Sequence, residues 1–136
     1  MSMKFITIFS ALVAGITADD VAKCASCFEA TGSDCIAAFN QMPTSGTLSG
    51  NDHSIWTSGS CTITYFPEGK GANAADVHGV AQTLINDCCW ESTCSGIAYD
   101  TGASTALENG CICMAEVGKT PCQCGGGTPA FDCIGH

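Results

Sequence analysis

Cysteine content constrains the fold of this chain more than any other feature of its sequence. The chain has twelve cysteines, all of them after residue 23. About one residue in ten of that part is cysteine, a share typical of a disulfide-stabilised scaffold in a small exported domain. An even number permits six bridges and leaves no obligatory free thiol. We therefore predict that all twelve form disulfides, namely Cys24, Cys27, Cys35, Cys61, Cys88, Cys89, Cys94, Cys111, Cys113, Cys122, Cys124 and Cys133.

The opening segment, MSMKFITIFSALVAGITADD, has the order of a secretory signal peptide. Lys4 precedes an apolar run, and small residues then lead to acids after Ala18. About a dozen apolar residues are too few for a helix that spans a bilayer, which needs about 20. The alternative is a buried N-terminal helix, which would normally have a polar face, and this segment has none. We expect residues 1–18 to be a signal peptide and residues 19–136 to be one cysteine-rich extracellular domain.

The cysteine spacing favours structural disulfides over metal binding or redox chemistry. Neighbours Cys88 and Cys89 are expected to reach separate partners, because a bond between them would close a strained ring. The pair Cys24-x-x-Cys27 also fits zinc, but a four-ligand site requires a second matching pair, and the C-x-C motifs at 111–113 and 122–124 are too tight. A redox centre would normally follow a strand of a βαβ unit, and here only the leader precedes it. We predict no metal and no cofactor, and the sequence leaves the pairing open.

Net charge argues against two classes of partner. After loss of the leader, three lysines and no arginine stand against thirteen acids, a formal charge near −10. Phosphate-binding surfaces need clustered Lys and Arg, and anionic membranes repel a chain of this charge. We therefore expect neither nucleic-acid binding nor membrane insertion.

The N-terminal half of the domain predicts two helices and a loop. Residues 19–29 begin with acids, which favours a short helix. Ser33 is a candidate cap for a second helix over residues 33–42, which would end before Pro43. Residues 44–57 are rich in Ser, Thr, Gly and Asn and predict a long surface loop.

The C-terminal half predicts strands around one long helix. Residues 59–66 alternate in polarity, and residues 95–100 and 111–117 give two further strands. Asn73 is a candidate cap for a helix that runs to Cys89. One apolar stripe at helical spacing is expected to face the sheet and consists of Val77, Val80, Ala81, Leu84, Ile85 and Cys88.

These elements predict an α+β fold, a small disulfide-rich sandwich in which helices pack on an antiparallel sheet of three to four strands. Tyr65 and Tyr99 are expected to face the helix. Cys61 in the first strand and Cys88 or Cys89 at the helix end are plausible bridge ends. The Gly-rich tail, residues 119–136, is expected to be held by its three cysteines.

One group of motifs resembles a known family. The residues are GSCTITY at 59–65, a helix that ends in NDCC at 86–89, and a strand that opens with Ser95-Gly96, preceded by a cysteine-bearing segment at 27–35. This pattern is similar to the Y-three-like glycan-binding family of mushroom-forming fungi. It is more distantly similar to killer toxins and to necrosis-inducing effectors of plant-pathogenic fungi. The resemblance covers residues 24–117, and the cysteines of the tail depart from it.

The resemblance implies a secreted fungal protein of lectin type that binds a glycan and does not turn it over. The alternative is a killer-toxin-like or host-directed effector protein that binds a protein or cell-surface target. The expected partner is a carbohydrate or cell-surface glycoconjugate, and the expected oligomeric state is a monomer or homodimer. The pattern carries no sugar-binding residue over to this chain.

Candidate catalytic residues are few. His53, His78 and His136 are the side chains that titrate near neutral pH. The run Asn-Asp-His-Ser at 51–54 contains an acid, a base and a hydroxyl, but sequence neighbours rarely converge as a triad. Asp87 and Glu91 would suit a glycosidase only at a separation of about 5–9 Å. We predict no catalytic residue and no enzymatic activity.

The two tryptophans give the candidate ligand-binding residues. Sugars commonly stack on aromatic faces flanked by polar side chains. Trp56 lies near Asp52 and His53, and Trp90 lies in the cysteine-rich loop. The competing interpretation, favoured by the low aromatic content, makes each tryptophan a core residue. The predicted ligand-binding residues are Trp56, Asp52, His53 and Trp90.

Overall fold

A computed structural model describes residues 20–90, 92–100, 107, 110–124 and 128–133. These ranges contain all twelve cysteines. The predicted signal peptide, residues 1–18, lies outside them, as do Glu91 and His136. The main element is an antiparallel five-stranded sheet of order β1-β9-β10-β5-β4, one strand more than the largest predicted number. Its strands are β1 (Asp20–Cys24), β9 (Gly96–Asp100), β10 (Cys111–Glu116), β5 (Cys61–Phe66) and β4 (Ser54–Ser58).

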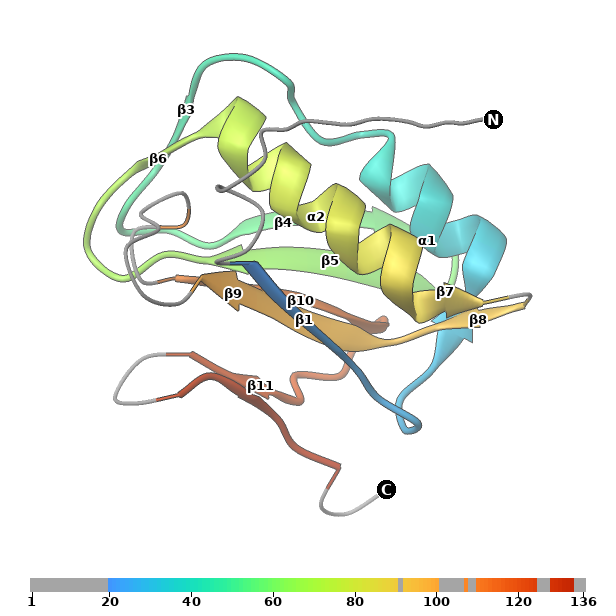
Figure 1. The fold of residues 1–136 in the computed structure, drawn as a ribbon. Helices are drawn as coiled ribbons and strands as arrows, with labels where there is room; N and C mark the ends of the chain where they lie inside the picture. The colour runs from blue at the N-terminus through green and yellow to red at the C-terminus, as the bar shows by residue number, and fades with distance from the viewer. Residues whose placement is uncertain (1–19, 91, 101–106, 108–109, 125–127, 134–136) are drawn as a thin grey trace, which may run out of the picture.

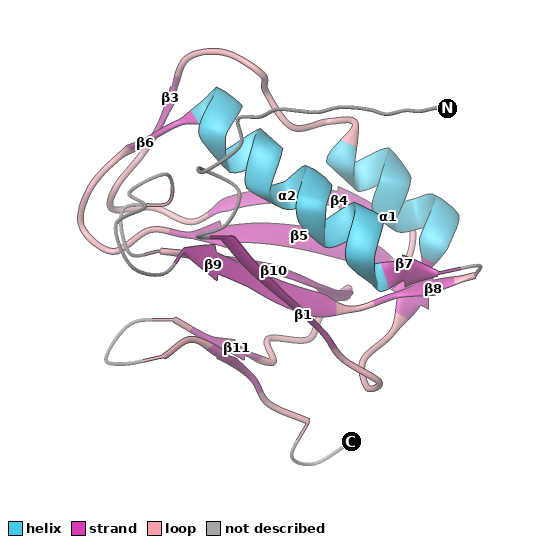
Figure 2. Ribbon diagram, in the orientation of Figure 1, coloured by secondary structure: helices cyan, strands magenta, loops and turns pink. Residues whose placement is uncertain are grey.

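Two helices cover one face of this sheet, and a small hairpin from the tail lies against the other, as Figure 1 shows. Figure 2 separates the helix layer from the strands by colour. The helices are α1 (Gly32–Phe39) and α2 (Ala74–Cys88). The tail hairpin consists of β11 (Cys122–Gln123) and β12 (Ala130–Phe131). The remaining short strands are β2 (Ala30–Thr31), β3 (Thr47–Leu48), β6 (Ala72–Asn73), β7 (Cys89–Trp90) and β8 (Thr93–Cys94).

The strongest local patterns of the sequence are confirmed. In β5 every second side chain is buried, which places one face of the strand in the core. The Asn73 side chain accepts a hydrogen bond of 2.9 Å from the backbone N–H of Ala75 and so caps α2. All six members of the predicted apolar stripe of α2 are buried. The α+β class and the strands β9 and β10 also follow the prediction.

The first strand occupies a segment whose sequence predicts a helix. β1 pairs antiparallel with β9 at the sheet edge, with Val21 opposite Tyr99. Ala22 packs against the core on the helix side, and Val21 packs against the cluster on the other face. The prediction of a helix over residues 19–29 is wrong, because burial on both faces of a sheet edge outweighs the weak helix preference of so short a segment.

The other edge strand lies inside the predicted loop. β4 pairs with β5 through a two-residue connection, residues 59–60, and places Trp56 opposite Ile63. The prediction that residues 44–57 form one continuous loop is therefore wrong. The composition of this segment favours turns. Strand β5, which follows it directly, nevertheless pairs with it through backbone hydrogen bonds, and the composition of the segment does not indicate that pairing.

Helix α1 is confirmed with a different start. Its N-cap is Thr31, which is extended and makes no side-chain capping bond, so the predicted cap at Ser33 is wrong. β2 pairs with β8 directly before the helix, and the backbone N–H of Gly32 donates to the Ser92 carbonyl at 2.7 Å. This pairing sets the point at which the chain turns into the helix.

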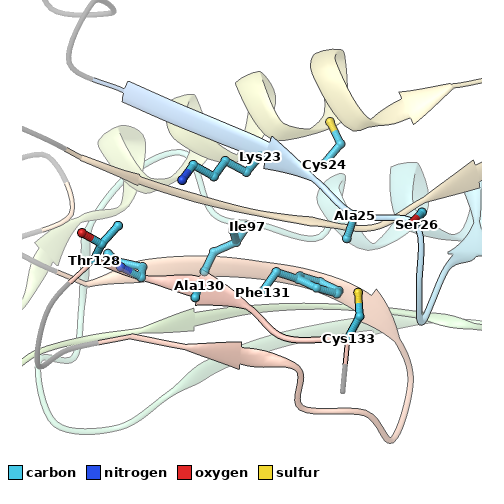
Figure 3. A pocket seen from close by; sticks show the side chains of 10 residues that line it. Lys23, Cys24, Ala25, Ser26, Ile97, Thr128, Ala130, Phe131 and Cys133 are labelled. Atoms are coloured by element: carbon cyan, nitrogen blue, oxygen red, sulfur yellow. The ribbon is translucent and has the colours of Figure 1, made fainter. Parts of the chain in front are cut away.

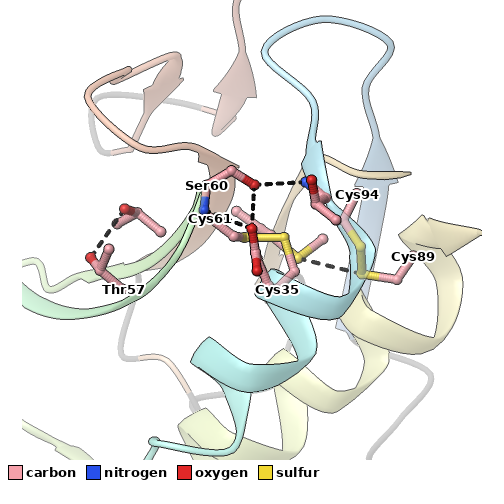
Figure 4. The surroundings of a disulfide bond; sticks show 10 residues. Cys35, Thr57, Ser60, Cys61, Cys89 and Cys94 are labelled. Carbon is pink, nitrogen blue, oxygen red and sulfur yellow. Dashed lines mark hydrogen bonds between the residues drawn. A yellow bond between two sulfur atoms is a disulfide. The ribbon is translucent and has the colours of Figure 1, made fainter. Parts of the chain in front are cut away.

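A carboxylate of α1 holds the turn between β4 and β5 (Figure 4). Asp34 accepts hydrogen bonds from the backbone N–H of Ser60 at 2.8 Å and from its hydroxyl at 2.7 Å. The Ser60 hydroxyl oxygen in turn accepts from the backbone N–H of Thr31 at 2.9 Å. The backbone bond first, and the hydroxyl bond second, lower the pKa of Asp34 below its ordinary value of 3.8. The turn thus depends on the ionised form of Asp34.

Side chains bury two separate cores, one on each face of the sheet. The main core lies between the helices and the sheet and contains Tyr65, whose hydroxyl donates to the Leu107 carbonyl at 3.1 Å. The second core lies between the sheet and the tail hairpin and contains Ile97, Tyr99 and Cys111. Tyr65 therefore faces the helices as predicted, whereas Tyr99 does not, because alternate residues of a strand point to opposite faces.

All twelve cysteines are paired, as predicted. The neighbours Cys88 and Cys89 bond different partners, Cys24 and Cys94 respectively. A native bridge in a small domain is commonly worth about 2–5 kcal/mol, so the set is a major source of stability. The six disulfides are Cys24–Cys88, Cys27–Cys133, Cys35–Cys61, Cys89–Cys94, Cys111–Cys124 and Cys113–Cys122.

Neither α1 nor α2, the helices in the described part of the chain, has the length and apolar character needed to cross a membrane.

Candidate functional site

A cleft of about 500 Å³ lies between the end of β1, strand β9 and the tail hairpin. Its walls come from segments far apart in the sequence. Figure 3 shows Ile97 and Phe131 near the middle of the lining, with Lys23 and Thr128 toward one end and Ser26 and Cys133 toward the other. The lining residues are Lys23, Cys24, Ala25, Ser26, Ile97, Thr128, Pro129, Ala130, Phe131 and Cys133.

Disulfides fix the hairpin wall of this cleft. Two bridges join the hairpin region to β10, and the Cys27–Cys133 bridge joins its end to the segment after β1. Within the hairpin, Phe131 lies opposite Cys122. The Phe131 ring packs against the core formed by Ile97, Tyr99 and Cys111, so one side chain contributes to both core and cleft. The cleft is therefore held by covalent bonds and shaped by a half-buried aromatic ring.

Hydrogen bonds fix the opposite wall, where β1 ends. The backbone N–H of Ala25 donates to the Ser95 carbonyl at 3.0 Å, and the Ser95 hydroxyl donates to the Ala25 carbonyl at 2.8 Å. Ser95 is 2% exposed, so this pair of bonds is sheltered from water. Lys23, two residues before Ala25, is exposed, and its Nζ lies 5.7 Å from the centroid of the Tyr99 ring. The ammonium is thus placed at the cleft by a rigid backbone.

The chemical groups of the cleft are suited to recognition. Ser26 and Thr128 offer hydroxyls, Phe131 offers an aromatic ring, and Lys23 offers a positive charge. Of the ten lining residues none is an acid or a histidine, although the chain has thirteen acids. This set can stack against a ring and exchange hydrogen bonds, but it contains no pair of groups for general acid–base work.

A second, smaller cleft of about 320 Å³ is lined by other residues of the hairpin region. Here Lys119 lies 5.7 Å from the centroid of the Phe28 ring. Phe28 itself has a positive φ of 52°. Asp132 also lines this cleft, so its charge is mixed. The two clefts have no lining residue in common.

The structure separates the predicted ligand-binding residues of the 51–56 region. Trp56 packs against the main core on the helix side of β4. The His53 ring lies 4.5 Å from the ring of Phe66, which packs on the other face. Asp52 is exposed, and its backbone N–H donates to the Ser49 hydroxyl at 3.2 Å. Trp56 and His53 thus do not combine into one site, and none of the three residues lines a cleft described above.

The other predicted groups give no further site. Trp90 lies in β7, and its side chain is outside the described part, as is Glu91. His78 is half-buried with its ring 4.5 Å from the Phe39 ring. Among the residues with described positions, no three His, Cys, Asp or Glu side chains gather as metal ligands. The cleft residues Phe131, Thr128 and Lys23 were not predicted, although the position of Phe131 close to Cys133 is a signal that it is held near the core.

The comparisons with known proteins leave the family open. The resemblance to Y-three-like glycan-binding proteins therefore rests on the sequence motifs alone. No protein-family model matches this chain, and no curated protein or solved structure shows significant similarity to it.

Proposed function

We propose that this chain is a secreted glycan-binding protein that holds a sugar in the cleft between β1 and the tail hairpin. The observation that carries the proposal is the lining of that cleft, which combines one aromatic ring, two hydroxyls and one ammonium without a carboxylate among its ten residues. Its volume, about 500 Å³, falls within the range of small-ligand sites.

The groups present match the two sides of a sugar. The C–H face of a pyranose stacks on an aromatic ring, here Phe131, as amphipathic ligands commonly do. Its hydroxyls can bond with Ser26 and Thr128, which lie at opposite ends of the lining (Figure 3). Disulfides and the bonds of Ser95 hold both walls before any ligand arrives, which reduces the entropy cost of binding.

Binding without turnover is part of the proposal. Glycoside hydrolysis generally uses two carboxyl groups on either side of the scissile bond. The ten lining residues of the cleft supply no carboxyl group. Secretion is supported by the six disulfides, which persist in oxidising compartments.

A glycan array probed with the oxidised secreted protein tests this function. We expect binding to a defined sugar class, lost when the disulfides are reduced. Thr128→Trp, which puts a large ring at an exposed cleft position, should weaken binding at least about tenfold. The control is Thr44→Trp, at an exposed loop position away from the cleft, which should bind like the wild type.

Two results would contradict the proposal. One is a folded protein that binds no glycan on the array. The other is binding that Thr128→Trp leaves unchanged but Trp56→Ala abolishes, which would move the site to β4. In the first case an effector or toxin activity, tested by plant-necrosis and growth-inhibition assays, becomes the better hypothesis.

A further inference from the structure

The positive charges of this acidic protein are placed unevenly. Three lysines lie in the described part of the chain, at positions 23, 70 and 119. Lys23 lines the larger cleft, Lys119 lines the smaller one, and Lys70 lines neither. Asp132 lines the smaller cleft, whereas none of the ten described residues that line the larger cleft is acidic. The larger cleft is therefore a site of positive charge on a chain whose formal net charge is −9.

The Lys23 ammonium is available to a ligand. Its side chain is exposed, and within the described residues its Nζ lies over the face of the Tyr99 ring and not beside a carboxylate. A cation over an aromatic face keeps its charge and most of its hydrogen-bonding capacity. A carboxylate in the cleft would thus form a charge-assisted hydrogen bond without first displacing a protein anion.

The rest of the lining suggests what carries that carboxylate. Thr128 lies toward the same end of the cleft as Lys23, and Phe131 lies nearer the middle (Figure 3). A ligand with a carboxylate beside a hydroxyl and an adjoining apolar ring face would meet all three groups. Uronic acids and sialic acids have this arrangement, because their carboxylate is attached directly to the sugar ring.

We propose that the cleft selects glycans that carry a carboxylate, and that Lys23 determines this specificity. The inference rests on the glycan-binding function proposed above and names its ligand class. The overall negative charge does not oppose it at close range, because at physiological salt the Debye length is about 8 Å and distant acids are screened. The contact between the Lys23 ammonium and the carboxylate of the ligand then determines the difference in affinity between acidic and neutral glycans.

Matched ligand pairs test the inference. Oligogalacturonides are compared as free acids and as full methyl esters, and sialyllactose is compared with lactose, by titration calorimetry at about 0.15 M salt. One pair measures the effect of masking the charge, and the two pairs together distinguish uronic from sialic acids. We expect the acid of at least one pair to bind about five- to tenfold more tightly than its neutral partner.

Three lysine variants give the controls. Lys23→Gln should remove the preference for the acid, so that the acid and its neutral partner bind with similar affinity. Lys23→Arg should retain the preference, because the charge is kept. Lys70→Gln removes an equal charge outside both clefts and should behave like the wild type.

The possible failures are distinguishable. Equal binding of acid and neutral partners, with no effect of Lys23→Gln, would overturn the inference and leave the proposed function standing. Equal losses in Lys23→Gln and Lys70→Gln would also overturn it, since they would show a general charge effect. If no sugar of any kind binds the folded protein, the proposed function itself fails.

Discussion

On the helix side of the sheet, residues of α1, α2 and the strands bury a continuous core that includes Leu84, Ile63 and Ile112. On the hairpin side, the fully packed residues are Ile97, Tyr99 and Cys111. The hairpin region compensates with three disulfides that join it to the rest of the domain. One face of the sheet is therefore stabilised mainly by burial of apolar surface, and the other mainly by covalent connection. The proposed ligand cleft lies on the covalent side.

The largest effect is expected in the main core. Leu84→Ala should lower the free energy of unfolding by about 3–5 kcal/mol, because it leaves a cavity between helix and sheet. The matched change Ile97→Ala should cost only about 2 kcal/mol, because Ile97 borders the cleft and the space that it leaves is open on one side instead of enclosed. Urea denaturation of the oxidised proteins measures both. Equal losses would mean that the two faces are packed alike.

Removal of one hairpin bridge should have the next largest effect. Cys113→Ala combined with Cys122→Ala opens a loop of sequence separation 9 and should cost roughly 2–3 kcal/mol. We expect faster hydrogen exchange in β11 and β12, with little change in α2. The control is Cys35→Ala combined with Cys61→Ala, which should loosen α1 instead. If α2 exchange also accelerates in the first variant, the hairpin is not an independent layer.

A smaller effect is expected at the start of α2. Asn73→Ala removes the side-chain cap of the helix and should cost about 1 kcal/mol by thermal denaturation. Asn51→Ala, at an exposed loop asparagine, is the control and should stay within about 0.5 kcal/mol of the wild type. A loss at Asn73 no larger than in this control would show that packing alone holds the helix start.

The smallest effect concerns pH and the polar attachment of α1 to the β4–β5 turn. The folded pKa of Asp34 is lowered, so its contribution to stability is present above the ordinary value of 3.8 and is lost as pH falls through the folded pKa. The melting temperature should therefore drop below about pH 4 by more in the wild type than in Asp34→Asn. Melting temperatures that fall equally in both proteins at low pH would contradict this prediction. That result would mean that the hydrogen bonds between Asp34 and Ser60 do not contribute to stability.

Much of the helix side could be predicted from the sequence, because its signals are local. The stripe of α2 repeats within one segment, Asn73 stands directly before it, and β5 alternates within its own residues. β1 could not be predicted in the same way. Its five residues form a strand because they pair with β9, which lies more than seventy residues away along the chain. The composition of the segment itself does not indicate that pairing.

The cleft could not be predicted because both its walls depend on distant pairings. The hairpin reaches the sheet through bridges to Cys111, Cys113 and Cys27, and the sequence leaves this connectivity open. The grouping of Trp56 with His53 was based on proximity in the chain. On a recognised strand their odd spacing would have placed them on opposite faces, as the structure does.

The Cys27–Cys133 bridge has a consequence for the resistance of the protein to proteolysis. Its sequence separation is 106, so it closes nearly all of the described chain into a covalent ring. A single backbone cut at any bond between these two cysteines leaves a fragment attached at each end of the bridge. The protein would thus remain one molecule after nicking, and neither wall of the cleft would be released until a second cut or a reductant arrived.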